Sequence, residues 1–185
     1  VPTLRSAQID DPGSLDEMLR QTDALINCAG PFADFGPPVV EAAIRNGVHY
    51  LDTTGEQSYI EWVQQECAPR AIENDVVLMP ACAFEYATGM LASSLAIEQG
   101  ASRVVTGYAV SDFATSPGTK KSIVRSVATP GKGYADGRLV DRQPAEVIYN
   151  VPAPGGSRRT GLWFPGGEAI LLPAFKQVDQ AESCL

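Results

Sequence analysis

The sequence is constrained most by an alternation, over its first 80 residues, of short apolar runs with longer segments of helical pattern. The runs at 24–29, 48–52 and 76–80 are too short for helices, and their mainly apolar composition is typical of buried parallel strands. Helix-like segments at 39–46 and 58–74 separate them. Strands that alternate with helices through short connections predict βαβ units around a parallel sheet.

The start of this pattern carries further local signals. We expect residues 3–10 to be extended and to supply one more strand. Residues 14–17 read Ser-Leu-Asp-Glu, a capping box that predicts a helix beginning at Ser14. Pro37 and Pro38 should lie in the first turn of the helix at 39–46, because proline is tolerated there.

The pattern changes after residue 82. Extended stretches then follow one another between Gly and Pro clusters, which predicts a mixed or antiparallel sheet. The polar tail after Phe175 should fray. In chain order we expect a helix at 86–99, a strand at 102–110, a helix at 118–127, and extended stretches at 134–140, 146–151 and 161–172. The sequence therefore predicts an α/β chain with a parallel-sheet domain over 1–81 and a second α+β domain over 82–185.

Charge and hydropathy exclude two classes of partner. The chain has 22 acidic against 14 basic residues, a formal net charge of −8, and so lacks the basic surface that nucleic-acid binding requires. No apolar run approaches the roughly 20 residues of a membrane-spanning helix. We therefore expect a protein that does not bind nucleic acid and has no membrane span.

Histidine and cysteine usage restricts the chemistry further. His49 is the single histidine, which excludes metal sites with two or more His ligands from one chain. We expect no metal site, and a packed or hydrogen-bonded imidazole at His49. The four cysteines show no C-x-x-C spacing, and we expect mostly buried, reduced thiols in a cytoplasmic protein.

Loops that follow strands are the places to look for a ligand site, because ligands of parallel sheets bind at the carboxyl ends of the strands. In the first such loop, the Asn27 amide and the N–H groups of Ala29 and Gly30 are candidate donors to phosphate or ribose oxygens. Pro31 stiffens the loop and Phe32 offers an apolar wall. The alternative is an ordinary turn whose Asn27 points inward.

Acidic residues mark the next two strand ends. Asp52 ends a predicted strand and Glu56 follows it, although a Glu near a helix start also complements the helix dipole. Glu85 is either a substrate-facing carboxylate or a first-turn helix acid. We expect Cys82 to be a buried thiol rather than a nucleophile. The segment 116–122 resembles an anion-binding helix start, with simple capping by Ser116 or Thr119 as the alternative.

Three strings of residues together resemble the saccharopine dehydrogenase-like oxidoreductases, including the branch of the trans-acting enoyl reductases. They are Asp23–Phe32, Gly36–Ala42 and Gly47–Glu56, and the similarity extends through 80–85 and 118–122. The resemblance implies a Rossmann domain that binds a nicotinamide cofactor, usually NADP(H) but alternatively NAD, and a second domain, with the substrate held between them. It implies a cofactor site formed by Asp10, Asn27, Cys28, Ala29, Gly30, Pro31, Phe32 and Asp52.

The same resemblance leaves the catalytic residues open, with Tyr50, Glu56 and Glu85 as candidates by position. Ala83 stands where the family pattern has glycine, and Met90 where relatives often place an acid. No G-x-x-G-x-x-[GA] cofactor turn precedes residue 10, so we expect a segment or a truncated relative with little dinucleotide affinity of its own.

An alternative to the oxidoreductase is a non-catalytic, Rossmann-derived module. Such a module would form a homodimer through its second-half sheet, for example through the extended stretch 146–151. For the oxidoreductase we expect a small-molecule substrate of unidentified class.

Overall fold

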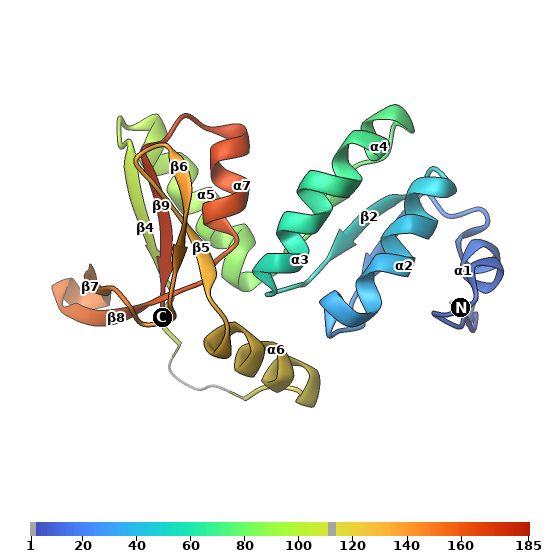
Figure 1. Ribbon diagram of the computed structural model, residues 1–185, viewed down its shortest axis with the longest axis horizontal. Coiled ribbons are helices and arrows are strands. Elements are labelled where there is room, and N and C mark those ends of the chain that lie inside the picture. Colours follow the sequence, from blue (N-terminus) through green and yellow to red (C-terminus); the bar gives the residue numbers. More distant parts are fainter. Residues whose placement is uncertain (1–2, 111–113) are drawn as a thin grey trace. The chain divides into compact units, whose positions relative to one another are not determined.

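The computed structural model describes residues 3–110 and 114–185 of the chain (Figure 1). The chain divides into two compact units. The first comprises Val1–Thr54 and Tyr59–Cys82, and the second comprises Gly55–Ser58 and Ala83–Leu185. The short segment 55–58 thus belongs to the second unit, although it lies within the sequence of the first.

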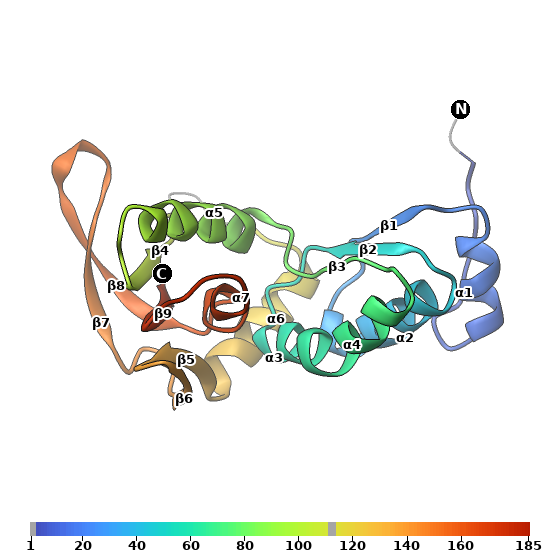
Figure 2. The same cartoon turned by 90° about the horizontal axis from the view of Figure 1, so that it is seen from above.

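The first unit is built on a parallel sheet of order β1-β2-β3. Its register aligns Leu25 with Tyr50 and Tyr50 with Leu78, and these three side chains pack into the core with the helices. Figure 2 shows α2 and α4 on one face of β1 and β2. The elements are α1 (Pro12–Leu19), β1 (Ala24–Asn27), α2 (Phe32–Arg45), β2 (His49–Asp52), α3 (Gln57–Trp62), the π-helix η1 (Val63–Cys67), α4 (Ala68–Glu73) and β3 (Leu78–Met79).

The expected strand at 3–10 and the expected capping box are both wrong. Residues 3–8 carry no regular structure and 9–10 form a turn. The helix α1 begins before Ser14, because Asp11 caps it by accepting hydrogen bonds from the amides of Gly13 and Ser14, with Pro12 in the first turn. The Ser14 hydroxyl instead accepts from the Gln8 amide.

The helix expected at 39–46 is longer than its prolines suggested. It begins at Phe32, so Pro37 and Pro38 lie inside α2 rather than in its first turn. The Phe32 ring is buried and lies 6.1 Å from the Tyr59 ring, which anchors the extra turns in the core. Tertiary packing thus outweighs the hydrogen bonds that the two prolines cannot donate.

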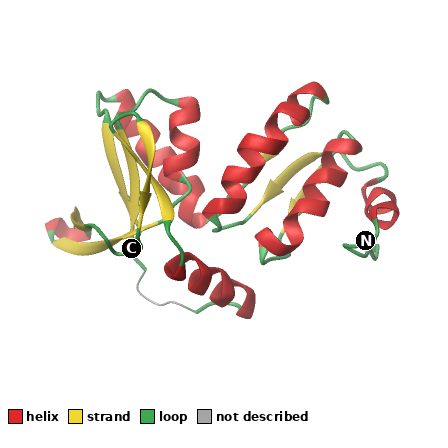
Figure 3. Cartoon of the chain, viewed as in Figure 1, coloured by secondary structure: helices red, strands yellow, loops and turns green. Residues whose placement is uncertain are grey.

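The second unit holds a mixed sheet of order β6-β5-β9-β8-β7, with β4 parallel to β9 and the other pairings antiparallel (Figure 3). Its core joins Val104, Leu172, Val178 and Ala181. A parallel sheet followed by a mixed one confirms the predicted fold class. The elements are α5 (Phe84–Glu98), β4 (Arg103–Gly107), α6 (Pro117–Ala128), β5 (Gly131–Ala135), β6 (Arg138–Arg142), β7 (Ile148–Pro152), the 3-10 helix η2 (Pro154–Gly156), β8 (Arg158–Phe164), α7 (Glu168–Phe175) and β9 (Gln180–Cys184).

Two expectations for this half are wrong. The tail after Phe175 does not fray: β9 pairs with β4, β5 and β8, and its residues 181–184 are buried. The stretch 161–172 is not extended throughout, because β8 ends at Phe164 and α7 begins at Glu168. In both places, contacts between residues that are distant in sequence stabilise a structure that the local sequence pattern does not indicate.

Candidate functional site

The carboxyl ends of β1, β2 and β3 lie at one edge of the first unit's sheet, because the three strands are parallel. The first loop at this edge begins with three exposed residues, Cys28, Ala29 and Gly30. It leads directly into α2, whose N-cap, Pro31, offers no side-chain hydrogen bond to the first turn. An exposed loop therefore lies beside the positive end of a 14-residue helix at this edge.

Asn27 points inward, as the alternative interpretation had it. Its Nδ2 donates to the Tyr50 hydroxyl at 3.1 Å, and its Oδ1 accepts from the Ala29 amide at 3.0 Å. The hydroxyls of Tyr50 and Tyr59 are hydrogen-bonded at 3.0 Å. The Asn27 side-chain amide and the Ala29 N–H are thus hydrogen-bonded within the protein, and these bonds stabilise the loop.

Asp52 is completely buried at the end of β2. Its Oδ1 accepts hydrogen bonds from the amides of Thr54 (2.9 Å) and Ala81 (2.8 Å). Burial raises the pKa of this carboxyl, although the two amides act in the opposite direction. Its side chain therefore contacts the neighbouring loops rather than the surface.

Asp10 differs from the other predicted cofactor residues in its setting. It is exposed in the turn that precedes α1, and it does not end a strand of the sheet. The expectation that a strand delivers Asp10 to the ligand edge is therefore wrong.

The three catalytic candidates lie in different surroundings. Tyr50 is completely buried in the first unit, and burial raises the pKa of its hydroxyl. Glu56 is buried in the second unit, where it accepts from the Ser122 hydroxyl at 2.9 Å and from Arg125 at 3.2 Å. Glu85 is half-buried in the first turn of α5, and burial raises its pKa.

Two of the four cysteines differ from expectation, whereas His49 is hydrogen-bonded as expected. Cys82 is exposed rather than buried, because it lies in the loop after β3, and Cys28 is exposed as well. Cys67 and Cys184 are buried. His49 is exposed on β2, and its Nδ1 accepts from the Val77 amide at 3.1 Å. Within the described residues no group of three or more His, Cys, Asp or Glu side chains is arranged to hold a metal ion.

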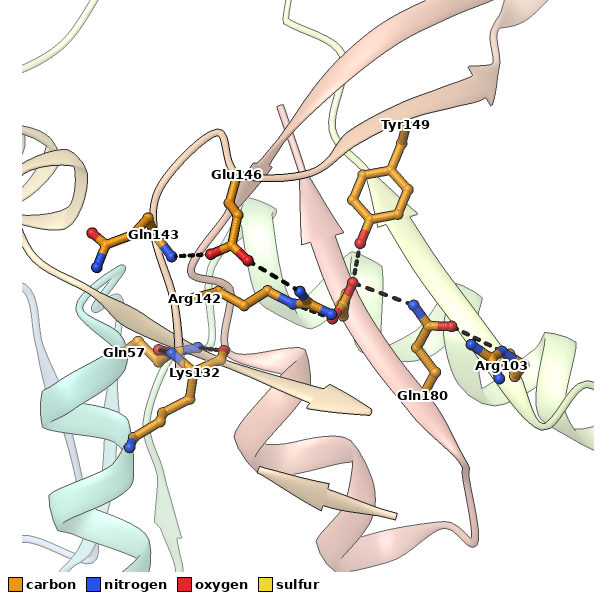
Figure 4. A network of polar contacts seen from close by, with 9 residues as sticks. Gln57, Arg103, Lys132, Arg142, Gln143, Glu146, Tyr149 and Gln180 are labelled. Atoms are coloured by element: carbon orange, nitrogen blue, oxygen red, sulfur yellow. Dashed lines mark hydrogen bonds and ion pairs between the residues drawn. The ribbon is translucent and has the colours of Figure 1, made fainter. Parts of the chain in front are cut away.

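Two buried carboxylates in the second unit were not predicted. Glu168 accepts from the Ser183 hydroxyl at 2.6 Å and from Tyr108. Glu182 accepts from Arg142 at 2.7 Å and from Tyr149, and Gln180 also donates to it (Figure 4). The sequence offered one indirect indication of Glu182, the glycine at 133. A Cβ at Gly133 would come 2.8 Å from Glu182.

Gln57 ties segment 55–58 to the second unit. Its Nε2 donates to the carbonyl oxygens of Lys132 and Gly166, each at 2.7 Å, and its Oε1 accepts from the Lys132 amide at 2.6 Å. The pairing with Lys132 is visible in Figure 4. The Tyr86 hydroxyl donates to the Gly55 carbonyl at 3.2 Å.

Comparison with known proteins agrees with this architecture. Residues 3–79 match the family model described as the saccharopine dehydrogenase NADP binding domain. Those residues are therefore similar to that domain family. The predicted resemblance to saccharopine dehydrogenase-like oxidoreductases is confirmed.

Named relatives extend the similarity over more of the chain. A probable mitochondrial saccharopine dehydrogenase-like oxidoreductase of Arabidopsis thaliana is 30% identical over 182 residues, which is 90% of this chain and 40% of that protein. The human saccharopine dehydrogenase-like oxidoreductase is 34% identical over 90 residues, 45% of this chain and 21% of its own. The chain thus spans about two fifths of the plant relative and less of the human one.

A solved structure shares the fold across nearly the whole chain. Apo saccharopine dehydrogenase (L-Glu forming) from Saccharomyces cerevisiae superposes with a TM-score of 0.55 at 14% identity, covering 96% of this chain and 43% of that one. At this identity the likeness shows the fold alone. Among the described residues, no helix is both long enough and apolar enough to span a bilayer.

Proposed function

We propose that this chain is part of an NAD(P)-dependent oxidoreductase, and that its first unit contacts NADP(H) through the loop Asn27–Phe32. The observation that carries the proposal is the position of this loop. It is exposed from Cys28 to Gly30, it follows a parallel strand, and it opens directly onto the N-terminus of α2. Such helix starts favour phosphate groups, and the segment lies within the match to an NADP-binding domain.

The residues of this loop suit a dinucleotide in two respects. Gly30 presents no side chain to an approaching ligand, and the bonds of Asn27 to Tyr50 and to the Ala29 amide keep the loop in one conformation. Asp34, in the first turn of α2, opposes an anion at this place and should limit affinity. When bound, NADP(H) supplies or accepts the hydride, while the loop holds it in place.

For the proton that accompanies hydride transfer, we favour Glu85 among the three candidates. Tyr50 and Glu56 are buried and hydrogen-bonded within the protein. Glu85 is half-buried, and its raised pKa keeps a proton available on the carboxyl closer to neutral pH. The proposed substrate is a small molecule, and cytoplasmic location and homodimer formation are further proposals.

Backbone amide chemical shifts during titration with NADPH test the cofactor proposal. We expect the amides of Cys28, Ala29, Gly30 and Phe32 to shift in a saturable way, more strongly with NADPH than with NADH. Ala29→Glu adds a negative charge to the loop and should weaken NADPH binding about tenfold or more. The matched control is Ile72→Glu, which adds the same charge at an exposed position on α4.

Two results would contradict the proposal. One is a folded protein in which the amides of Cys28, Ala29, Gly30 and Phe32 do not respond to millimolar NADPH, about the weakest binding that the titration can follow. The other is equal loss of affinity in Ala29→Glu and Ile72→Glu, which would indicate a general charge effect rather than a site at the loop.

A further inference from the structure

The chain passes out of the first unit at two places, after Thr54 and after Cys82. One residue holds the chain at both. The Oδ1 atom of Asp52 accepts from the amides of Thr54 (2.9 Å) and Ala81 (2.8 Å). The backbone oxygen of Asp52 also accepts from the Cys82 amide, at 2.7 Å.

Without Asp52, the two segments that it joins would lose hydrogen bonds that stabilise their conformations. Ala81 has a φ of +61°, in the left-handed region that a residue with a Cβ seldom adopts. Its N–H and that of Thr54 are buried, so each needs an acceptor. A carboxyl oxygen at the end of β2 satisfies both donors at once.

The position of Asp52 argues against direct contact with a ligand. The side chain is 0% exposed, its Oδ1 is engaged twice, and its Oδ2 lies in the interior, without a hydrogen-bond partner among the described residues. The hydroxyls of Tyr50 and Tyr59 also favour its charged form. A group enclosed in this way acts on the site through the loops that it holds.

We propose that Asp52 is a positioning residue, which fixes the peptide groups of Thr54, Ala81 and Cys82 and thereby sets the course of the chain toward Glu56 and Glu85. The link to those two residues rests on the proposed function. The clamp itself concerns only the first unit and stands on its own hydrogen bonds.

Hydrogen exchange of the free protein tests the clamp. In Asp52→Ala the side-chain acceptor is lost, and we expect exchange at Thr54 and Ala81 to rise about tenfold or more, while β1 and α2 keep their protection. The Cys82 amide keeps its acceptor, the backbone oxygen of residue 52, and should change less. In Asp52→Asn the Oδ1 acceptor remains, so protection at the three amides should stay within about threefold of the original protein.

A second aspartate provides a matched control. The Asp11 carboxylate also accepts two backbone amides, those of Gly13 and Ser14, but at the start of α1. Asp11→Ala should release the first turn of α1 and leave Thr54, Ala81 and Cys82 unchanged. If Asp52→Ala leaves the Thr54 and Ala81 amides protected, or if Asp52→Asn exposes them, the clamp is overturned. Should Asp52→Ala not fold, the Asn variant alone decides in the same way.

NADPH titration of Asp52→Asn separates positioning from cofactor contact. We expect an affinity within about threefold of the original protein. A loss of about tenfold or more, with the three amides still protected, would make Asp52 a cofactor ligand and overturn its positioning role. If the unaltered protein binds no NADPH, the proposed function fails, yet the exchange pattern still decides whether Asp52 is a clamp.

Discussion

Asp52, Glu168 and Glu182 are carboxyl residues with at most 1% of their surface exposed, and each is accommodated differently. Glu182 has a cationic partner, because Arg142 donates to it at 2.7 Å. Asp52 accepts from backbone amides. Glu168 accepts from the hydroxyls of Ser183 and Tyr108, and burial outweighs these bonds to raise its pKa. A buried carboxyl that is stabilised mainly by hydroxyl groups favours its protonated form.

Glu168 should therefore weaken the protein as the pH rises. Its pKa is higher in the folded than in the unfolded chain, so its stabilising contribution is complete below the unfolded value of about 4.3 and is lost as the pH passes the folded pKa. Glu168→Gln cannot titrate. We expect the free energy of unfolding of the original protein to fall, relative to Glu168→Gln, as the pH rises above the unfolded value, as measured by urea denaturation. A difference between the two that is independent of pH, or that changes in the opposite direction, would show that Glu168 is charged when folded.

Helices and strands differ in how far local sequence determined them. The apolar runs indicated β1, β2 and β3, and the helical pattern before Gly100 indicated α5. The start of α2 was missed because Pro37 and Pro38 mask a helix that the burial of Phe32 stabilises. The central strand β9 was missed because its polar residues find their hydrogen-bond partners only in the folded sheet. Local propensity cannot register partners that are distant in sequence.

Within α5, one glycine is required by its neighbours rather than by the helix. A Cβ at Gly89 would come 2.9 Å from Thr106 and would also collide with Tyr108 and Glu168. Gly89→Ala should destabilise the second unit by about 1–3 kcal/mol, although alanine favours an unhindered helix by about 1 kcal/mol. Thermal or urea unfolding measures the change, with Ala92→Gly at an exposed position of α5 giving the size of the propensity effect. A Gly89→Ala protein that is more stable than the original would show that the neighbours can move aside.

At the scale of the whole molecule, the predicted succession of a parallel sheet and a mixed sheet is confirmed, and the strand-end loop was indicated from sequence. The surroundings of the site residues were not. Asn27 and Asp52 are turned inward by hydrogen bonds to Tyr50, Thr54 and Ala81. Burial of this kind depends on three-dimensional packing, so sequence placed these residues at the correct edge without revealing what their side chains contact.

Removal of residues 180–185 should affect the two units unequally. The second unit would lose β9, which pairs with β4, β5 and β8, together with the buried Glu182 and Ser183. The core of the first unit contains none of these residues. In an NMR spectrum of the shortened chain we expect dispersed amide signals from the first unit and collapsed signals from the second. Persistent dispersion in both would mean that β9 is dispensable.

The hydrogen bonds of Gln57 determine where the chain can be divided into separate fragments. Its side-chain amide pairs with Lys132 much as a neighbouring peptide would, and it also satisfies the Gly166 carbonyl. The four residues Gly55–Ser58 are therefore part of the second unit, although they are encoded within the sequence of the first. Division of the chain at residue 82 yields two fragments. The second fragment then lacks Gly55–Ser58, which belong to the second unit.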